Sequence, residues 1–409
     1  MKKLVRQALI KLRLKDLIPI FHIPAEICNY LNYLFYSSYG RMIKQDHKMI
    51  IFASYDGNRF ADSPKVIYNK MLNDERFENY TFIWAFSNPS KFKIKRGAKV
   101  KLNSFKFYLL AQRAGLIISN TSLGDAFYYK GPETIHINTW HGTAIKVLGH
   151  DRKTPFNRWV FQGKRTVDYF CAQSDHDIEV YASAFKFPKE KVLKTGLPRN
   201  DELTEVTKKE IECIKNKLGI ALDKKVILYA PTYRNYHVDY KENYLEKSLV
   251  NFEFWHKVLG DEYCVLFRAH YFIAKIQIEK IDGSFVKDVT GYPLVNDLLK
   301  VSDILITDYS SIAFDFSILE RPILFYAYDY EEYIGKVGIY LDLQKDIPND
   351  IIKTEENLLK KILNMDYHEQ IQKTKLFKGK YLNYYGDATQ KMLDFIIGKL
   401  SPEKEKTIS

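Results

Sequence analysis

Cysteine is scarce in this 409-residue sequence, which contains only Cys28, Cys171, Cys213 and Cys264. The four residues lie far apart, and no two of them have the CxxC spacing of a zinc or redox site. Neither a disulfide framework nor a zinc site is therefore indicated, and the composition fits a reducing, cytosolic setting.

Long hydrophobic runs are also missing. No stretch of about 18 or more apolar residues occurs, so we predict no membrane-spanning helix. The basic start resembles a signal peptide, but Lys11, Arg13 and Lys15 interrupt any apolar segment. Basic and apolar residues separate onto different helix faces, which favours a segment over residues 1–47 that lies on an anionic membrane surface. The alternative is a helix packed on the protein's own core.

Acidic residues are outnumbered, because 62 Lys and Arg residues against 50 Asp and Glu residues give a net charge of +12. This excess indicates an anionic partner: nucleic acid, a phosphorylated substrate or an anionic membrane surface. No recognised nucleic-acid-binding motif occurs, and the lysines are scattered along the chain. We therefore expect a phosphate-rich substrate and a peripheral position on the cytoplasmic face of the membrane, and no nucleic-acid partner.

Internal repeats and low-complexity segments are absent, and the length suits two domains. From residue 48 onward, apolar runs of strand length alternate with helical stretches, which predicts an α/β fold with parallel sheets. We expect two Rossmann-like domains facing a central cleft. The predicted parts are an N-terminal domain, a helical linker, a C-terminal domain and closing helices that return to the N-terminal domain, over residues 48–203, 204–222, 223–375 and 376–409.

The pattern also places individual elements. The expected strands are residues 49–55, 80–86, 116–121, 226–231, 264–270, 303–308 and 322–327. Ser63 and Pro64 predict a helix start with Ser63 as the cap, and Gly219 marks the end of the linker helix. Ligands of such folds bind beyond the carboxyl ends of the strands, so polar residues there are candidates for the site.

The segment TDYSSIAFDF, residues 307–316, lies at a predicted strand-to-helix junction. Ser310 and Ser311 stand where the helix begins, so their hydroxyls and the unpaired backbone N–H groups form a candidate phosphate site. A plain serine N-cap is the alternative. We expect Asp308 at the carboxyl end of the strand, and Asp315 in the helix with a structural role.

Two further strand ends carry basic residues. Arg268 and His270 in FRAHY are two positions apart, so in a strand both would point to the same side and address one ligand. A guanidinium suits a phosphoryl group, and an imidazole can protonate a departing phosphate oxygen. Arg234 follows the strand that ends in APTYR. A structural role for a buried histidine remains the alternative at His270.

The segment TWHGT places His141 between Trp140 and Gly142. The histidine could pack in the core, bind a metal or act as a base. A metal would need further ligands, and the local sequence offers only His136 and His150, so metal binding is disfavoured. Histidine titrates near neutral pH, which favours a base that removes a proton from a hydroxyl group.

These segments together resemble one protein family. TWHGTAIKVLGHD, GLPRND, LYAPTYR, FRAHY and TDYSSIAFDFSILERPILFYAYDYEEY are similar, in order, to motifs of the CDP-glycerol glycerophosphotransferases of wall teichoic acid synthesis. The earlier segment SYDGNRFADSPKVIY resembles that family's first strand, loop and helix. The resemblance extends from about residue 48 over nearly all of the chain.

The resemblance implies a GT-B fold and transfer of an alditol phosphate from a CDP-linked donor to a hydroxyl group of a lipid-linked acceptor, with release of CMP. By motif, His141 would be the base that activates the acceptor hydroxyl, and His270 would steady or protonate the CMP leaving group. Donor phosphate or nucleotide contacts would come from Arg234, Arg268, Asp308, Ser310 and Ser311, whereas Trp140, Gly142 and Thr143 would be acceptor-side or structural. No metal or other cofactor is implied.

This sequence departs from the family pattern at Ala144, where proline is frequent, and at Tyr233, where tryptophan is frequent. Neither change removes a reacting group, but both could alter the fit of acceptor or nucleotide. The motifs do not read the length of the polyol, so CDP-ribitol and capsule-polymer substrates remain alternatives, as does a UDP-sugar glycosyltransferase. Priming and polymerisation both remain open, although the lack of a large added N-terminal domain mildly favours the addition of one or a few units.

Overall fold

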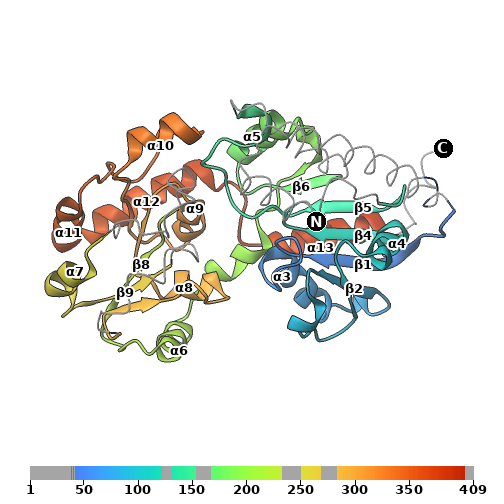
Figure 1. Cartoon of the computed structure of the whole chain (residues 1–409), viewed down its shortest axis with the longest axis horizontal. Coiled ribbons are helices and arrows are strands. Elements are labelled where there is room, and N and C mark those ends of the chain that lie inside the picture. Colours follow the sequence, from blue (N-terminus) through green and yellow to red (C-terminus); the bar gives the residue numbers. More distant parts are fainter. Residues whose placement is uncertain are drawn as a thin grey trace, which may run out of the picture.

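The computed structural model describes residues 38, 40, 42–121, 123, 130–152, 167–232, 250–268 and 283–400. In these ranges the chain forms two all-parallel β-sheets covered by helices, which confirms the predicted α/β class. Figure 1 shows the two sheets in two halves that lie side by side. Nearly all of the predicted amphipathic segment lies outside the described residues, and so do Arg234 and His270.

Seven parallel strands form the first sheet, in the order β3-β2-β1-β4-β5-β6-β7. The strands are β1 Asp46–Ala53, β2 Thr81–Phe86, β3 Ala98–Lys101, β4 Ala114–Ser119, β5 Ile135–Asn138, β6 Tyr169–Cys171 and β7 Val192–Leu193. The three strands expected in this half are therefore confirmed. Their side chains are mostly buried because helices cover both faces of the sheet.

The two faces of the first sheet can be followed along β1, whose side chains alternate in direction. Ile50 and Phe52 pack against α3 (Asp62–Met71) and α13 (Ala388–Leu400). Ile51 and Ala53 pack on the other face, against α4 (Phe105–Arg113). Helix α5 (Asp175–Phe185) contributes to a third cluster beside β6. Short 3-10 turns lie at Glu75–Phe77, Pro89–Lys91, Gly149–Asp151 and Lys189–Lys191.

The start of α3 differs from the prediction. The helix begins at Asp62, its N-cap residue is Ala61, and no side chain caps it. The predicted capping role of Ser63 is therefore wrong. Its hydroxyl instead accepts a hydrogen bond from the backbone N–H of Arg199, at 3.3 Å, so a tertiary contact has taken the place of the local one.

Five parallel strands form the second sheet, in the order β10-β9-β8-β11-β12. They are β8 Lys225–Tyr229, β9 Tyr263–Phe267, β10 Val286–Asp288, β11 Ile304–Thr307 and β12 Ile323–Phe325, and four of them were expected from the sequence. The helices of this half are α6 Lys208–Leu218, α7 Phe252–Leu259, α8 Val295–Val301, α9 Ile312–Ser317, α10 Tyr330–Val337, α11 Glu355–Leu363 and α12 Tyr367–Tyr381.

The two faces of the second sheet bury separate clusters. Helices α6, α8, α9 and α12 pack on one face, and α7 and α11 pack on the other. Helix α6 starts with a capping box made by Thr207 and Glu210, and it ends at Gly219, which has a φ of 64° as left-handed C-caps do. The predicted end of this helix is thus confirmed. Among the described residues, no helix combines the length and apolar composition needed to cross a bilayer.

The chain passes between the halves at the 3-10 helix η8 (Pro198–Leu203), and it returns before α13. The carboxylate of Asp201 in η8 accepts hydrogen bonds from the backbone N–H groups of Ala388 and Thr389, at 3.0 and 2.7 Å. These residues start α13, so η8 holds the returning end of the chain. Side chains of α13, including Met392 and Ile396, are fully buried in the core of the first half.

A second contact between the halves is made by backbone. Residues 145–147 of the first half lie antiparallel to residues 338–340 of the second half. The N–H of Val147 donates to the carbonyl of Gly338 at 3.2 Å, and the N–H of Tyr340 donates to the carbonyl of Ile145 at 2.7 Å. This contact begins directly after the TWHGT segment, so it fixes that segment against the second half.

Candidate active site

The segment that carries His141 follows β5 and turns sharply. Trp140 and Gly142 have φ angles of 54° and 138°, in the region that favours glycine. Trp140 is held there by a hydrogen bond from its N–H to Oδ1 of Asn138, at 2.8 Å, and by edge-to-face packing of its ring on Phe170 and Phe185. Trp140 therefore anchors the turn in the core of the first half.

His141 is partly buried, and a hydrogen bond to the backbone helps to orient its ring. Its Nδ1 lies 2.7 Å from the backbone carbonyl oxygen of Asn120, which follows β4. A carbonyl oxygen only accepts, so Nδ1 carries the proton and Nε2 of the neutral ring keeps its lone pair. The ring also lies 4.4 Å from that of Trp140 and 6.2 Å from that of Tyr55, measured between centroids. His141 thus has the tautomer that a base acting through Nε2 requires.

Thr143 is buried behind this turn. Its hydroxyl donates to Oδ2 of Asp177 at 3.1 Å and accepts from Nε2 of Gln173 at 2.9 Å. Burial raises the pKa of Asp177 to about 6, although the charge of the neighbouring His176 opposes this shift. Thr143 therefore supports the turn through α5.

Gly142 brings the turn into contact with the second half. A Cβ atom at this position would lie only 2.6 Å from Oγ of Ser311 and 3.4 Å from Nη2 of Arg199. Because the side chain of Ser311 lies this close and φ at this position is 138°, the position favours glycine. The sequence-predicted residues around His141 and at the start of α9 therefore meet, although they lie on different halves of the molecule.

The junction between β11 and α9 has polar side chains in different settings. Ser311 is the N-cap residue of α9, but its side chain makes no capping hydrogen bond. The hydroxyl of Ser310 accepts from the N–H of Ile312 at 3.4 Å. Asp308 is fully buried and accepts hydrogen bonds from the backbone N–H groups of Thr232, at 2.9 and 3.0 Å, and Tyr309, at 2.6 Å. Asp308 thus ties the end of β8 to this junction.

Arg268 directly follows β9 and is partly buried. Its Nη1 donates to the carbonyl oxygens of Val289 and Tyr292, at 2.8 and 2.9 Å. Burial lowers the pKa of Arg268, and the positive charge of Arg59 in the first half lowers it further. The guanidinium of Arg59 lies 5.0 Å from the ring centroid of Tyr55. Two like charges from opposite halves are thus close enough to disfavour each other, which an anion between them would relieve.

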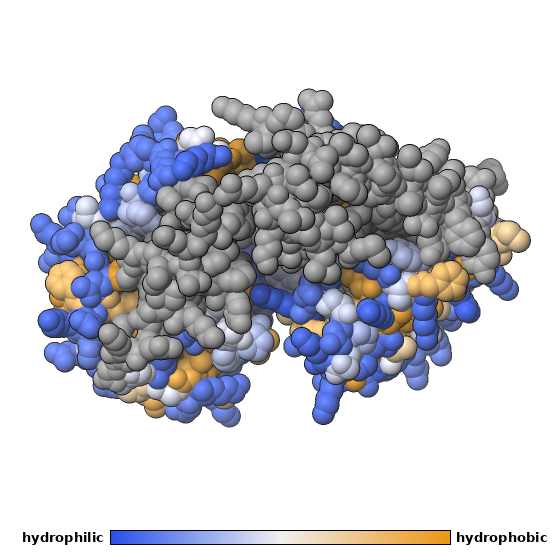
Figure 2. Space-filling view, in the orientation of Figure 1, coloured by the Kyte–Doolittle hydropathy of each residue, from blue (hydrophilic) through white to orange (hydrophobic). Residues whose placement is uncertain are grey.

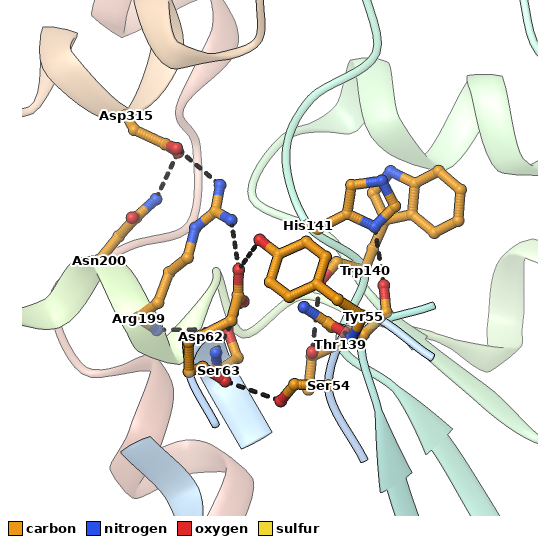
Figure 3. Close-up of polar contacts among 12 residues, drawn as sticks. Ser54, Tyr55, Asp62, Ser63, Thr139, Trp140, His141, Arg199, Asn200 and Asp315 are labelled. Atoms are coloured by element: carbon orange, nitrogen blue, oxygen red, sulfur yellow. Dashed lines mark hydrogen bonds and ion pairs between the residues drawn. The ribbon is translucent and has the colours of Figure 1, made fainter. Parts of the chain in front are cut away.

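The sequence interpretation missed a buried ionic network that joins the halves (Figure 3). Nη1 of Arg199 lies 2.7 Å from Oδ2 of Asp62, and Nη2 lies 2.6 Å from Oδ2 of Asp315. Asp62 also accepts a 2.6 Å hydrogen bond from the hydroxyl of Tyr55, and Nδ2 of Asn200 donates to Oδ1 of Asp315 at 2.7 Å. Four of these residues, all except Asp315, lie in SYDGNRFADS and GLPRND, segments that carried the family resemblance without an assigned role.

The two carboxylates of the network respond differently to their surroundings. Burial alone would raise the pKa of Asp62, but the charge of Arg199 and hydrogen bonds from Tyr55 and Ser63 outweigh it, so this pKa is lowered. Burial raises the pKa of Asp315 in spite of Arg199. Asp315 does lie in a helix, as expected. Within the described ranges, no three His, Cys, Asp or Glu side chains gather as metal ligands would.

Comparison with known proteins places these features in one family. The family model described as CDP-glycerol:poly(glycerophosphate) glycerophosphotransferase matches residues 34–398. A teichoic acid glycerol-phosphate transferase of Staphylococcus aureus is 32% identical over 379 residues, which cover 88% of this chain and 96% of the relative. A teichoic acid poly(glycerol phosphate) polymerase of Staphylococcus epidermidis is 34% identical over 381 residues, 87% of this chain and 52% of the relative. The chain thus spans about half the length of the polymerase.

Solved structures agree with this placement. The wall teichoic acid polymerase TagF is 31% identical and superposes with a TM-score of 0.82, over 99% of this chain and 98% of the polymerase chain. A variant of the same polymerase soaked with CDPG gives a TM-score of 0.81 over 98% and 97%. Because the family model covers most of the sequence, this chain belongs to the CDP-glycerol:poly(glycerophosphate) glycerophosphotransferase family.

Proposed function

We propose that this protein transfers glycerol phosphate from CDP-glycerol to a hydroxyl group of a lipid-linked teichoic acid precursor and releases CMP. One observation carries the proposal: in a chain of this family, the turn beside the candidate base His141 contacts Ser311 at the candidate phosphate site of the other half. The two kinds of group that phosphoryl transfer requires thus meet at one junction.

His141 acts as the general base in this proposal. Its Nδ1–H is held by the carbonyl of Asn120, so Nε2 takes the proton of the acceptor hydroxyl. The acceptor oxygen then forms a bond to the phosphorus that carries glycerol, and the bond between that phosphorus and the bridging oxygen of CMP breaks. His270 steadies or protonates the departing CMP phosphate. Trp140, Gly142 and Thr143 form the turn that positions this base.

Cationic and polar groups of the second half hold the donor in this proposal. Arg268 gains most from a bound diphosphate, because its burial and the nearby charge of Arg59 make an anionic neighbour favourable. Ser310 and Ser311 donate to phosphate oxygens from the start of α9, and Arg234 adds a second guanidinium. Asp308 contributes indirectly, since its carboxylate binds Thr232, two residues before Arg234.

The arrangement we propose is of the GT-B type, with two Rossmann-like domains that face a cleft. It is supported by the two parallel sheets and by the indented surface between the halves in Figure 2. We propose further that residues 1–47 bring the enzyme to the anionic cytoplasmic face of the membrane, where a lipid-linked acceptor would be found. The basic amphipathic composition of that segment supports this.

The test is an assay of CMP release with CDP-glycerol and a soluble analogue of the lipid-linked disaccharide. We expect release that requires both substrates, with CDP-ribitol and a UDP-sugar as comparison donors. Release from CDP-ribitol alone would replace glycerol phosphate by ribitol phosphate as the transferred group. Turnover of the UDP-sugar without release of CMP from either CDP-alditol would contradict the proposal.

A further inference from the structure

Arg199 connects the two halves of the molecule through one buried guanidinium. Asp62, its first partner, starts α3 in the first half, and Asp315, its second partner, lies in α9 of the second half. The three side chains are only 8%, 4% and 6% exposed. A planar guanidinium can bind two carboxylates at once in fixed directions, which the flexible point charge of a lysine cannot do. The geometry of α3 and α9 therefore depends on this residue.

A buried ion triad is a poor device for stability alone. Removing three charges from water costs about as much as their attraction returns, so an apolar set of the same volume would hold the halves together as well. The triad instead fixes the orientation of α3 relative to α9, since each of its hydrogen-bonded ion pairs has a defined length and angle. Asn200 strengthens the attachment of Asp315 at 2.7 Å, and the backbone N–H of Arg199 binds Ser63 at 3.3 Å.

The network also contacts the turn that carries the candidate base. A Cβ atom on Gly142 would lie 3.4 Å from Nη2 of Arg199 and 2.6 Å from Oγ of Ser311. Figure 3 shows Arg199 between Asp315 of α9 and the segment with Asp62, with His141 beyond Tyr55. The residue that ties α9 to the first half therefore lies against the segment where the two candidate sites meet.

We propose that Arg199 is a positioning residue, which holds α9 and its serines at a fixed distance from His141 so that base and donor phosphate are aligned. The inference rests on the proposed function of this site. A displacement of about 1 Å between reacting groups costs roughly 100-fold in rate. Because the donor contacts belong to the second half and the base to the first, loss of Arg199 slows the transfer step more than it weakens donor binding.

The variant Arg199→Lys tests this inference. We expect kcat for CMP release to fall by about 10- to 100-fold while KM for CDP-glycerol changes by less than about 3-fold. Arg76→Lys is the matched control. Arg76 also joins two carboxylates, those of Asp74 at 2.6 Å and Asp394 at 2.7 Å, but its side chain is 38% exposed. We expect the control to keep the wild-type kcat.

A second readout does not depend on turnover. Hydrogen exchange of peptides that contain residues 139–143 and 310–317 should be faster in Arg199→Lys than in Arg76→Lys and the wild type, in the unliganded proteins. If Arg199→Lys does not fold, Asp315→Asn, which keeps the shape but removes the charge, should show the same pattern.

The outcomes separate the two proposals. A wild type that releases no CMP from CDP-glycerol contradicts the proposed function, and the exchange measurement still decides on Arg199. Wild-type kcat in the folded Arg199→Lys variant, or unchanged exchange in both peptides, overturns the positioning role. Equal losses in kcat for Arg199→Lys and Arg76→Lys would also overturn it, because any lost ion pair would then have the same effect.

Discussion

In our proposal Nε2 of His141 acts as the base, because Nδ1 of the same ring already donates to the carbonyl of Asn120. We expect His141→Ala to lower kcat for CMP release by about 10²- to 10⁴-fold. The fold should persist, since the turn is anchored by Trp140, whose ring stays packed in the core. Steady-state CMP release and thermal unfolding measure the two effects.

His256→Ala is the control for that experiment. His256 lies exposed in α7, and its ring stacks on Phe285 at 4.8 Å. It should keep nearly the wild-type rate. A folded His141→Ala variant with a rate close to that of the wild type would remove His141 from the mechanism.

Asp177 accepts a hydrogen bond from the hydroxyl of Thr143 and should make the free energy of unfolding depend on pH. Burial raises its pKa to about 6 from the ordinary 3.8, so the folded state binds its proton more tightly than the unfolded state does. Free energy of unfolding is therefore lost as pH rises from about 4 to 6. The difference between the wild type and Asp177→Asn should shift against the wild type by about 2–3 kcal/mol over this window.

Urea unfolding of both proteins at several pH values measures this difference. The pH dependence of all other carboxyl groups cancels in the comparison. A difference that stays constant between pH 4 and pH 7 would contradict a raised pKa at Asp177.

Among the elements, α13 depends most clearly on a distant side chain. Asp201 in η8 accepts the N–H groups of Ala388 and Thr389, as a capping residue does, although it lies 187 residues away from Ala388. Asp201→Ala should lower the free energy of unfolding by about 1–2 kcal/mol, because two N–H groups at a helix start lose their acceptor. Chemical unfolding measures the change.

Glu179→Ala provides the comparison, since the ion pair that Glu179 makes with Lys189 is exposed to solvent. Such pairs contribute about 0–1 kcal/mol, so its effect should be the smaller one. If both variants unfold alike, the cap on α13 does not stabilise the fold.

At the scale of the whole molecule, the sequence predicts those features that depend on residues close to one another in the chain. Seven strands, β1, β2, β4, β8, β9, β11 and β12, were predicted because each is a short apolar run, and the residues around His141 and at Ser310 were found because they follow such runs. The role of Arg199 was missed because its partners Asp62 and Asp315 lie 137 and 116 residues away. The positive φ of Trp140 was equally hidden, since it depends in part on packing against Phe170, 30 residues further along the chain.

The membrane prediction also concerns the molecule as a whole. Deleting residues 1–20 should weaken binding to vesicles with anionic lipid, and the loss should be larger at low salt because screening is weaker there. Sedimentation of the protein with vesicles measures it. Equal binding of the full and shortened chains, at both salt concentrations, would contradict a membrane-binding role of this segment.

The place of α13 has a consequence for synthesis of the chain. The strands of the first sheet are synthesised before the second half, yet the face of β1 with Ile50 and Phe52 is covered in part by Met392 and Ile396, which are synthesised after the second half. That apolar face is therefore not covered by α13 while the second half is translated and folds. We infer that the core of the first half is completed only after the second half has been synthesised, and that a chain stopped before residue 388 lacks part of that core and not merely a tail.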